Sequence, residues 1–453
     1  MTLGAPSWSL TRAFTDLLGA WEADDPALMD QCRLLLLDGL AVAVAGAAEP
    51  GPMAMAEMVR AGGRGPAVVI GQGFAGQPVD AARVNGMAMH VLDYEPMWNP
   101  PNHALSPLLP GVLALAEQLE AEGAGPQGPA VLCAIARGVE AQGRLRLSSG
   151  QIEPAKLTLH PPGVVGPLAT ALACGAMLGL KGERLAAAVG IAASRSGGVL
   201  ANVGSMTKAL HCGDGAAHGL EAALLAARGF TADEDAIGSP RGWGPSLFGV
   251  AFDPAPLIAT LDTPRALDPG PAWKLFPSQF ATHFAITAAL AAREAIGGAA
   301  SQVRRIELRV PSMPYIDRPR PVNGLDGKFS WQYTAAIALL DGVVDPAAFT
   351  DARRFAPDVV ALLDHTMVVP DPVISGRFDR MHVDIVVELA DGTAVSHRCE
   401  APLGSWSRPV PPERIQTKAR GLLVETLGND RAGAVIGAVA EPGFSVRRLM
   451  GLL

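Results

Sequence analysis

The hydrophobic pattern of this chain changes after Leu275, and the change predicts two structural regions. Up to about residue 265 apolar residues recur at helical spacing, and Cys32 to Leu40 is apolar on nearly every side, as a buried helix is. After Leu275, apolar and polar residues alternate over 304–310 and 381–389, which is typical of half-buried strands. A chain of 453 residues is also longer than one hydrophobic core usually organises, so two domains are expected.

The same pattern gives the expected elements. Helices are predicted at 80–92, 107–121, 129–144, 164–179, 184–194 and 214–228, and beyond Leu275 at 283–296, 331–341 and 355–365. Asp391-Gly392 lies between the strand at 381–389 and a further strand at 393–399, which indicates a hairpin. We therefore predict a mainly α fold, with a large all-helical domain (1–269, completed by 401–453) and a smaller α+β lid domain (270–400).

Composition limits the partners of the chain. The net charge is −8 and no basic run occurs, which argues against binding to nucleic acid. The most apolar stretch, Leu34 to Ala48, contains Asp38 and is too short to cross a bilayer, and we recognise no signal peptide. Five scattered cysteines without a C-x-x-C pair indicate neither a disulfide scaffold nor a zinc ribbon. We therefore expect a cytoplasmic protein that does not associate with membranes.

Common cofactor motifs are missing or lack the right context. Gly71 to Gly76 matches G-x-G-x-x-G after a predicted strand at 67–70, but a dinucleotide site needs a helix that begins inside this loop. Here Gln77-Pro78 follows and the next helix starts too late. The sequence contains no H-E-x-x-H motif, no acidic calcium loop and no G-x-S-x-G elbow. We therefore expect no metal and no cofactor.

The segment from His90 to His103 is the strongest candidate for a site. A helix is expected to end near Leu92, and a proline-rich loop with Asp93, Trp98 and His103 then leads to the next helix. A rigid loop rich in polar and aromatic residues suits a site better than a linker. The alternative is a structural loop in which Asp93 caps a helix and His103 lies at the surface.

Four further segments carry candidate residues. His160 precedes a helix start built from small residues, where the helix dipole attracts an anion. Gly204 to His211 is interpreted as a loop that presents Lys208 before a helix capped by Asp214 or a neighbour. Lys274 lies at the domain boundary, and Tyr333 is one of only three tyrosines. Each of these residues could instead be a satisfied core or boundary residue.

Together these segments resemble the MmgE/PrpD family, whose members include 2-methylcitrate dehydratase, cis-aconitate decarboxylase and iminodisuccinate epimerase. The resemblance runs through nearly the whole chain. Its matching segments are Leu37-Asp38-Gly39, Val84-Asn85-Gly86, Leu92 to His103, Gly204 to Lys208, Asp214 to Leu220, Gly229-Phe230-Thr231, Lys274 to Ser278, and Gln332-Tyr333 with Ala338 to Gly342. It implies a helical domain with an α+β lid, a homodimer, and an active site between the domains.

The resemblance also places candidate residues, and the chain departs from the family at one point. Family positions are matched by Asp93, His103, His160, Lys208, Lys274 and Tyr333. Relatives of the decarboxylase type commonly have Asp-Phe-Asp-Asp-Thr where this chain has Asp93-Tyr94-Glu95-Pro96-Met97. Replacing the threonine hydroxyl with Met97 removes a donor that could hold a substrate carboxylate. This change weakens the decarboxylase interpretation most.

The residue types suit proton transfer beside a carboxylate. Such a reaction needs an acid or base near neutral pH and fixed cations that hold the carboxylates. We assign acid–base roles to His103 and His160, an orienting role to Asp93, and a proton or hydrogen-bond donor role to Tyr333. The predicted substrate-binding residues are Lys208, Lys274, Met97, Trp98 and His211.

The predicted substrate is a small di- or tricarboxylic acid. A cofactor-independent hydratase or dehydratase of the 2-methylcitrate dehydratase type ranks first among the possible activities. An epimerase or isomerase and a decarboxylase are the alternatives, and a non-catalytic dimeric binding protein is a remote one. Met97 and Trp98 hint at a substrate less polar than citrate.

Overall fold

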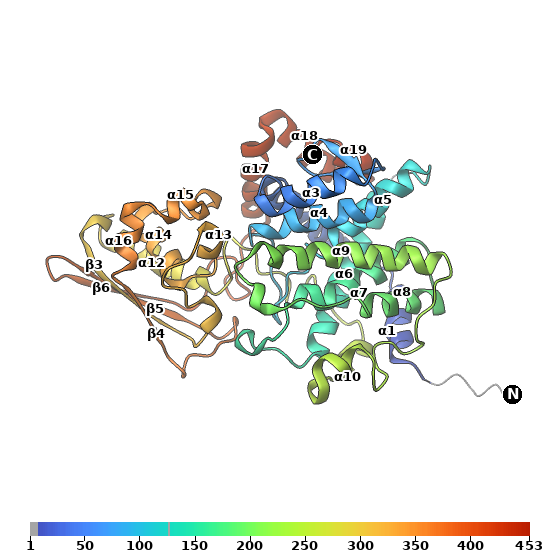
Figure 1. The fold of residues 1–453 in the computed structure, drawn as a ribbon, viewed down its shortest axis with the longest axis horizontal. Helices are drawn as coiled ribbons and strands as arrows, with labels where there is room; N and C mark the ends of the chain where they lie inside the picture. The colour runs from blue at the N-terminus through green and yellow to red at the C-terminus, as the bar shows by residue number, and fades with distance from the viewer. Residues whose placement is uncertain (1–7, 126) are drawn as a thin grey trace.

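The computed structural model describes residues 8–125 and 127–453, and it contains two regions with separate hydrophobic cores (Figure 1). The larger region is helical and is built from both ends of the chain. Its helices are α1 (Leu10–Gly19), α2 (Pro26–Gly46), α3 (Pro50–Ala61), α4 (Pro78–Val91), α5 (Leu109–Ala121), α6 (Gly128–Ser148), α7 (Pro161–Met177), α8 (Glu183–Ala193), α9 (Met206–Ala227), α10 (Trp243–Phe248), α11 (Ala255–Ile258), α17 (Pro412–Leu427), α18 (Asn429–Ala440) and α19 (Val446–Met450).

Small residues let the central helices of the larger region approach closely. A Cβ atom built on Gly86 in α4 would lie 2.8 Å from the Cα atom of Gly213 in α9, so only glycine fits at this crossing. Because α4 ends where the His90–His103 segment begins and α9 carries Lys208, this packing sets the distance between two parts of the candidate site. The glycines at this crossing therefore hold α4 and α9 at the separation that the site requires.

The smaller region is a four-stranded sheet with helices on one face (Figure 1). The strand order is β4-β3-β5-β6, in which β3 runs parallel to β4 and antiparallel to β5, and β5 runs antiparallel to β6. Its elements are α12 (Thr282–Ala295), β3 (Val303–Val310), α13 (Gly324–Gly327), α14 (Trp331–Asp341), α15 (Asp351–Arg354), α16 (Pro357–Leu363), β4 (Thr366–Pro370), β5 (Val383–Leu389) and β6 (Ala394–Cys399). The alternating residues Ile306 and Leu308 pair with Val387 and Ile385 and are fully buried, as their period predicts.

The G-x-G-x-x-G segment forms a hairpin. The strands β1 (Ala67–Val69) and β2 (Phe74–Gly76) pair antiparallel, and Gly71 and Gly73 take the positive φ angles of the turn between them. Helix α4 begins only at Pro78, beyond the second strand. The segment therefore lacks the helix N-terminus on which a pyrophosphate would sit.

Two local predictions were wrong. Helix α9 begins at Met206 after Ser205, so Lys208 and His211 lie in its first turns and not in a loop. Asp214 lies inside this helix, where its Oδ1 accepts a hydrogen bond from the Arg83 Nε at 2.9 Å. The glycines on either side of Asp214 allow close packing inside the helix, Gly213 against α4 and Gly215 against Pro107. Strand β4 was not predicted.

Within the described ranges no single helix is both long enough and apolar enough to cross a membrane. Helices α2 and α3 together are long and apolar enough by length and composition, but they are bent by 86° relative to each other.

Candidate active site

A cavity lies where the two regions meet, and both contribute to its walls. The larger region supplies the loop after α4, the start of α7 and the segment that leads into α9. The smaller region supplies Gln279, Tyr315, Phe329 and Phe378. The remaining lining residues are Asp93, Met97, Pro101, Asn102, His103, Pro154, Leu157, His160, Pro161, Pro162, Leu200, Val203 and Lys208.

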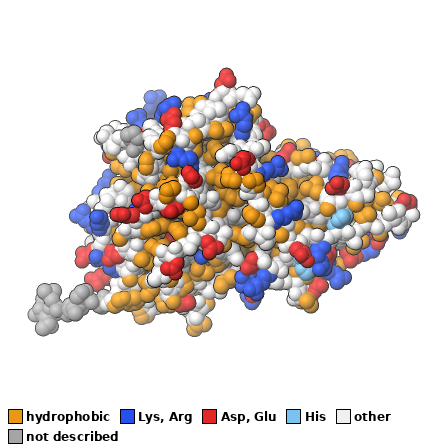
Figure 2. All heavy atoms as spheres, turned by 180° about the vertical axis from the view of Figure 1, so that it is seen from behind, with side chains coloured by type: hydrophobic (Ala, Val, Ile, Leu, Met, Phe, Trp, Pro, Cys, Tyr) orange, Lys and Arg blue, Asp and Glu red, His pale blue; other side chains and the backbone are white. Residues whose placement is uncertain are grey.

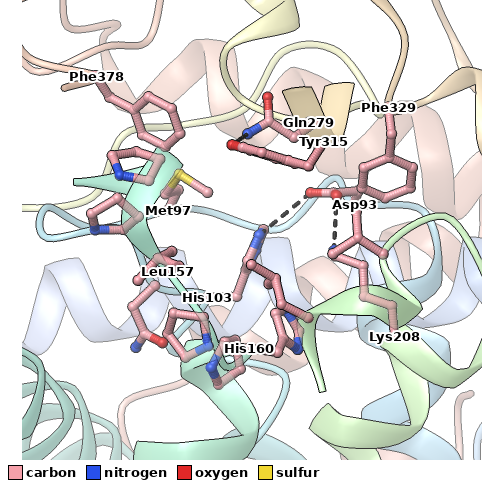
Figure 3. Close-up of a pocket in the computed structure, with 17 residues that line it drawn as sticks. Asp93, Met97, His103, Leu157, His160, Lys208, Gln279, Tyr315, Phe329 and Phe378 are labelled. Carbon is pink, nitrogen blue, oxygen red and sulfur yellow. Dashed lines mark hydrogen bonds and ion pairs between the residues drawn. The ribbon is translucent and has the colours of Figure 1, made fainter. Parts of the chain in front are cut away.

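Asp93 is the centre of the charged side of this cavity (Figure 3). It is 2% exposed and has a φ angle of 51°, the only positive φ of a non-glycine residue within the described chain. Aspartate tolerates this conformation better than most residues, at a modest cost in free energy. Its Oδ2 accepts a hydrogen bond from the Lys208 Nζ at 2.9 Å, its Oδ1 accepts one from Lys274, and the Nε2 of His103 lies 3.4 Å from Oδ1.

These neighbours keep Asp93 ionised. Burial alone would raise the pKa of Asp93, but attraction to Lys208 and Lys274 outweighs it and holds that pKa well below its usual range. Burial lowers the pKa of Lys274 to about 8, although the attraction of Asp93 opposes the shift. The pair is therefore a carboxylate and an ammonium at neutral pH, in a site that water hardly reaches.

Behind Lys208 lies a second buried group of polar residues. The Lys208 Nζ is 2.7 Å from the Nε2 of His90, and the Nδ1 of His90 is 2.7 Å from the Oε1 of Glu95. Because the ammonium can only donate, His90 accepts at Nε2 and its proton is assigned to Nδ1, which donates to Glu95. The backbone N–H of Ser106 donates to the other oxygen of Glu95 at 2.8 Å. Burial raises the pKa of Glu95 to about 8, while the hydrogen bonds from Ser106 oppose the shift.

The histidines that face the cavity are neutral at pH 7. Burial, together with the nearby ammonium groups, lowers the pKa of His103 and of His160 well below 6.5. His160 precedes α7, and its Nδ1 lies 3.2 Å from the Nδ1 of His211 in α9. The Nδ1 of His103 has no hydrogen-bond partner among the described residues. His103 can therefore gain a proton when a substrate brings negative charge.

The opposite side of the cavity is apolar (Figure 3). Met97 and Phe378 lie next to each other there, 5% and 4% exposed, and Leu157 completes this wall. The backbone of Met97 pairs in both directions with Ala272, with N···O distances of 3.0 and 2.7 Å. This bridge ties the loop of the larger region to the start of the smaller one and fixes the side chain of Met97 in the cavity.

The structure brings some predicted site residues together and leaves others apart. Asp93, His103, His160, Lys208 and Met97 all line the cavity. His211 does not line it, but it lies next to His160, which does. The roles assigned to these residues stay predictions.

Three assignments need correction, because the side chains already have partners elsewhere. Lys274 is fully buried behind Asp93 and gives its hydrogens to Asp93 and to the carbonyl oxygen of Ser278 at 2.8 Å, so it positions Asp93 and does not reach a substrate. Trp98 donates its indole N–H to the Arg265 carbonyl at 3.3 Å and packs in the helical core. Tyr333 is fully buried in the core of the smaller region and donates to the carbonyl oxygen of Ala348.

Sequence reasoning missed four residues. His90 and Glu95 were quoted within the strongest segment but received no role, although their spacing of five places them across the helix end. Tyr315 and Gln279 line the cavity, and the Gln279 Nε2 donates to the Tyr315 hydroxyl at 3.0 Å. Tyr315 lies in a short 3-10 segment, Pro314–Ile316, for which the hydrophobic pattern gives no signal.

Three side chains could in principle share a metal ion. One ligand atom each from His90, Glu95 and His103 fall within 4.8 Å of one another. However, the Nδ1 of His90 already bonds Glu95 directly, and the ammonium of Lys208 contacts the other nitrogen of the same ring. A metal cation there would also face Lys274. The donor set therefore suits proton sharing better than metal binding.

Comparison with known proteins identifies the family. Residues 12–254 match the MmgE/PrpD N-terminal domain and residues 276–441 match the MmgE/PrpD C-terminal domain. The chain is 32% identical to the cis-aconitate decarboxylase of Mus musculus over 376 residues, which cover 80% of this chain and 75% of that protein. Identity to the human cis-aconitate decarboxylase is 32% over 79% of this chain and 75% of that protein, and identity to the Aspergillus terreus one is 26% over 87% and 85%. The chain belongs to the MmgE/PrpD family.

This finding confirms the resemblance and the mainly α, two-part fold. It does not support the order in which the activities were ranked. The hydratase or dehydratase reaction was placed first, but these relatives are cis-aconitate decarboxylases, and they favour the decarboxylase alternative. The ranking gave too much weight to the single change at Met97.

Proposed function

We propose that this protein is a decarboxylase that removes CO₂ from a small unsaturated polycarboxylic acid of the cis-aconitate class. One observation carries the proposal. A buried cavity places the Asp93–Lys208 pair and His103 opposite an apolar wall, in a chain whose relatives are cis-aconitate decarboxylases. Such a cavity offers a fixed cation, a proton carrier and a surface that withdraws water from the departing carboxylate.

The reaction can be written with this arrangement. In an acid whose carboxyl-bearing CH₂ is next to a C=C bond, the bond between CH₂ and the carboxylate carbon breaks and CO₂ leaves. The electron pair enters the allylic system and is shared with the carboxylate at the far end, and the carbon beside that carboxylate then takes a proton. One proton is consumed for each CO₂ released, and the double bond shifts by one position. An apolar surface favours this step because the charge is more dispersed in the transition state than in the carboxylate.

The residues divide this work. Lys208 binds the carboxylate that accepts the electron pair, and Asp93 and Lys274 hold that ammonium in place. His103 gives the proton to carbon. Burial and the lysines hold down the pKa of His103, and a bound carboxylate favours its protonated form. His160 and Tyr315 complete the set of donors around the cavity.

A dehydratase of the 2-methylcitrate dehydratase type is the second candidate, because His103 and His160 both line the cavity and could serve as base and acid. Proton NMR in D₂O separates the reactions on a panel of cis-aconitate, 2-methylcitrate, citrate and iminodisuccinate. Decarboxylation gives CO₂ and a product with one deuterium beside the far carboxylate. Dehydration gives an alkene with no CO₂, and epimerisation puts deuterium into an unchanged skeleton. Conversion of 2-methylcitrate alone would overturn the decarboxylase proposal.

The matched variants are His103→Gln and His365→Gln, of which His365 is exposed and does not line the cavity. General acid catalysis contributes a factor of roughly 10² to 10⁴ to the rate. We therefore expect the rate of CO₂ release to be lower in His103→Gln by a factor of this size. The His365→Gln variant should match the unaltered protein. Full activity of His103→Gln would remove this histidine from the mechanism.

We also propose that the chain forms a homodimer, as the family resemblance implies. The mean hydropathy of +0.25 supports this proposal, as do the hydrophobic side chains that spread across the middle of one face (Figure 2). Light scattering after size exclusion measures the mass. A single chain of 46.8 kDa at micromolar concentration would contradict the proposal.

A further inference from the structure

We propose that the substrate is a dicarboxylate with an alkyl group at the position of the central carboxylate of cis-aconitate, and that Met97 selects it. This inference rests on the proposed decarboxylase reaction and names the substrate class of the same site. Three observations support it. The cavity has little positive charge, one of its walls has few hydrogen-bond donors, and the reaction does not require the central carboxylate.

The cavity carries little positive charge for a trianion. Among its lining residues the ionised side chains are Lys208 and Asp93, and these two pair with each other at 2.9 Å. Lys274 lies behind Asp93 with its hydrogens already donated to protein oxygens. Each carboxylate that enters a buried site without a cation or donors loses its hydration at a cost of several kcal/mol. The available cation and donors suit fewer than three carboxylates.

The donors that do exist lie on one side. Lys208, His103 and Tyr315 surround Asp93 (Figure 3). The Tyr315 hydroxyl accepts from Gln279 at 3.0 Å and donates only to the Met313 Sδ at 4.0 Å, a weak bond that a ligand carboxylate can replace. These groups can hold two carboxylates. A third one would have to point toward Met97 and Phe378, on the other side of the cavity.

That second wall offers few donors. The thioether of Met97 and the ring of Phe378 have none, and the backbone N–H of Met97 is used by the carbonyl of Ala272 at 3.0 Å. Prolines, which have no N–H, make up much of the remaining lining: Pro101, Pro154, Pro161 and Pro162. Asn102 donates one of its two amide hydrogens to the Gln142 Oε1 at 2.9 Å, which leaves at most one N–H from this side chain. A methyl or ethyl group fits this wall and a carboxylate does not.

The reaction itself can do without the central carboxylate. When CO₂ leaves the CH₂ end, the charge of the resulting allylic anion rests on its two end carbons and not on the middle one. The terminal carboxylate therefore stabilises the charge, and the departing one is lost, so both are needed. The central carboxylate sits on the middle carbon, and replacing it with an alkyl group leaves the chemistry intact.

Binding of unreactive ligands tests the preference directly. The probes are 3-methylglutarate and propane-1,2,3-tricarboxylate, which differ only in the group on the central carbon and contain no C=C bond. Calorimetry should show that the unaltered protein binds the methyl compound at least about tenfold more tightly, the usual effect of one group in a matched pocket. Met97→Thr adds a hydroxyl donor. In this variant we expect the preference for the methyl compound over the tricarboxylate, measured as the ratio of their dissociation constants, to decrease by about tenfold.

A matched control is Met367→Thr, the same substitution in β4 at a side chain that is 47% exposed and outside the cavity. It should leave the ratio unchanged. Tighter binding of the tricarboxylate by the unaltered protein would overturn the inference. An unchanged ratio in Met97→Thr would also overturn it.

Turnover separates this inference from the proposed function. The reactive pair is cis-aconitate and (E)-3-methylglutaconate, its analogue with a methyl group on the central carbon, and CO₂ release gives kcat/KM for each. A higher kcat/KM for the methyl compound, reversed or reduced in Met97→Thr, supports the inference. If cis-aconitate is favoured and Met97→Thr does not change the ratio, the inference fails while the decarboxylase proposal stands. If neither acid releases CO₂ but the binding preference holds, the decarboxylase proposal fails and the ligand class stands.

Discussion

Two buried aspartate–lysine groups in this protein have the same chemistry and different surroundings. Asp93 contacts Lys208 and Lys274 at the edge of the cavity, where the two regions meet. Asp38 in α2 contacts Lys418 in α17 at 3.0 Å, and both side chains are buried between helices. Lys418 also donates to the carbonyl oxygen of Tyr94 at 2.7 Å, so this pair supports the loop that carries Asp93 from behind.

The difference lies in the number of positive groups and in what the carboxylate faces. Two lysines hold the pKa of Asp93 well below its usual range despite burial. At Asp38 burial prevails over the single lysine, and the pKa is raised. A buried ion pair is therefore no indication of an active site by itself. Asp93 becomes a candidate because a second cation, a histidine and a cavity lie beside it.

Removing a lysine from each group should show that the Asp93 group serves activity and the Asp38 pair serves stability. The largest effect on activity is expected at Lys208. In Lys208→Met the cavity loses its lining cation, which we expect to lower kcat/KM for CO₂ release by roughly 10²- to 10³-fold. Lys274 still neutralises Asp93, so the melting temperature should change little. Lys181→Met, at an exposed lysine, is the matched control. Near-normal turnover by Lys208→Met would show that the cation of this pair is not used.

The opposite pattern is expected for Lys418→Met. This change leaves Asp38 buried without its partner, which costs about 3–5 kcal/mol in comparable cases, so the midpoint of thermal unfolding should fall clearly. Activity measured well below that midpoint should stay within about tenfold of normal, because Lys418 acts only through the backbone of the loop. The double variant Asp38→Asn/Lys418→Met should recover stability. A loss of activity with an unchanged melting midpoint would place Lys418 in the catalytic machinery.

The pH dependence of activity should report on the Asp93 group and not on the Asp38–Lys418 pair. Burial lowers the pKa of Lys274 to about 8, so its ammonium holds Asp93 below that pH and loses its proton above it. We expect kcat/KM to fall as pH rises through about 8. Because the pKa of Glu95 is also raised to about 8, Glu95→Gln is the control, and the decline should persist in that variant. A profile that stays level to pH 9.5 would contradict the assignment to Lys274.

The contrast also shows what the sequence can predict. The hydrophobic period predicted the change of structure after Leu275 and the positions of α14, β3 and β5, because these patterns depend on neighbours along the chain. The clustering of Asp93, His103, His160 and Lys208 was also expected, and all four line one cavity. Here the resemblance to the family joined segments that local patterns cannot join.

The direction in which a side chain points was not predictable in the same way. Lys274 was expected to bind a carboxylate of the substrate, and it binds that of Asp93, because a lone buried ammonium takes the nearest acceptors. Glu95 reaches His90 because the helix ends between them, and a small shift of that end would separate the two. Such contacts depend on the position of a helix end within a residue or two, which local patterns do not specify.

Two tyrosines repeat the contrast at a smaller scale. Tyr333 is fully buried, and its hydroxyl donates to the carbonyl of Ala348. Tyr315 lines the cavity, and its hydroxyl donates only to the Met313 Sδ at 4.0 Å, a weak bond that a ligand can replace. Tyr315→Phe removes a donor to the substrate, so kcat/KM should fall by about tenfold, equivalent to about 1.4 kcal/mol, with little change in stability. Tyr333→Phe should cost about 1 kcal/mol of stability and leave kcat/KM within about twofold, because only an internal hydrogen bond is lost. Kinetics and thermal unfolding of the two variants decide between them. The reverse result would restore Tyr333 to the site, and it would mean that the smaller region takes up a different position against the larger one when substrate is bound.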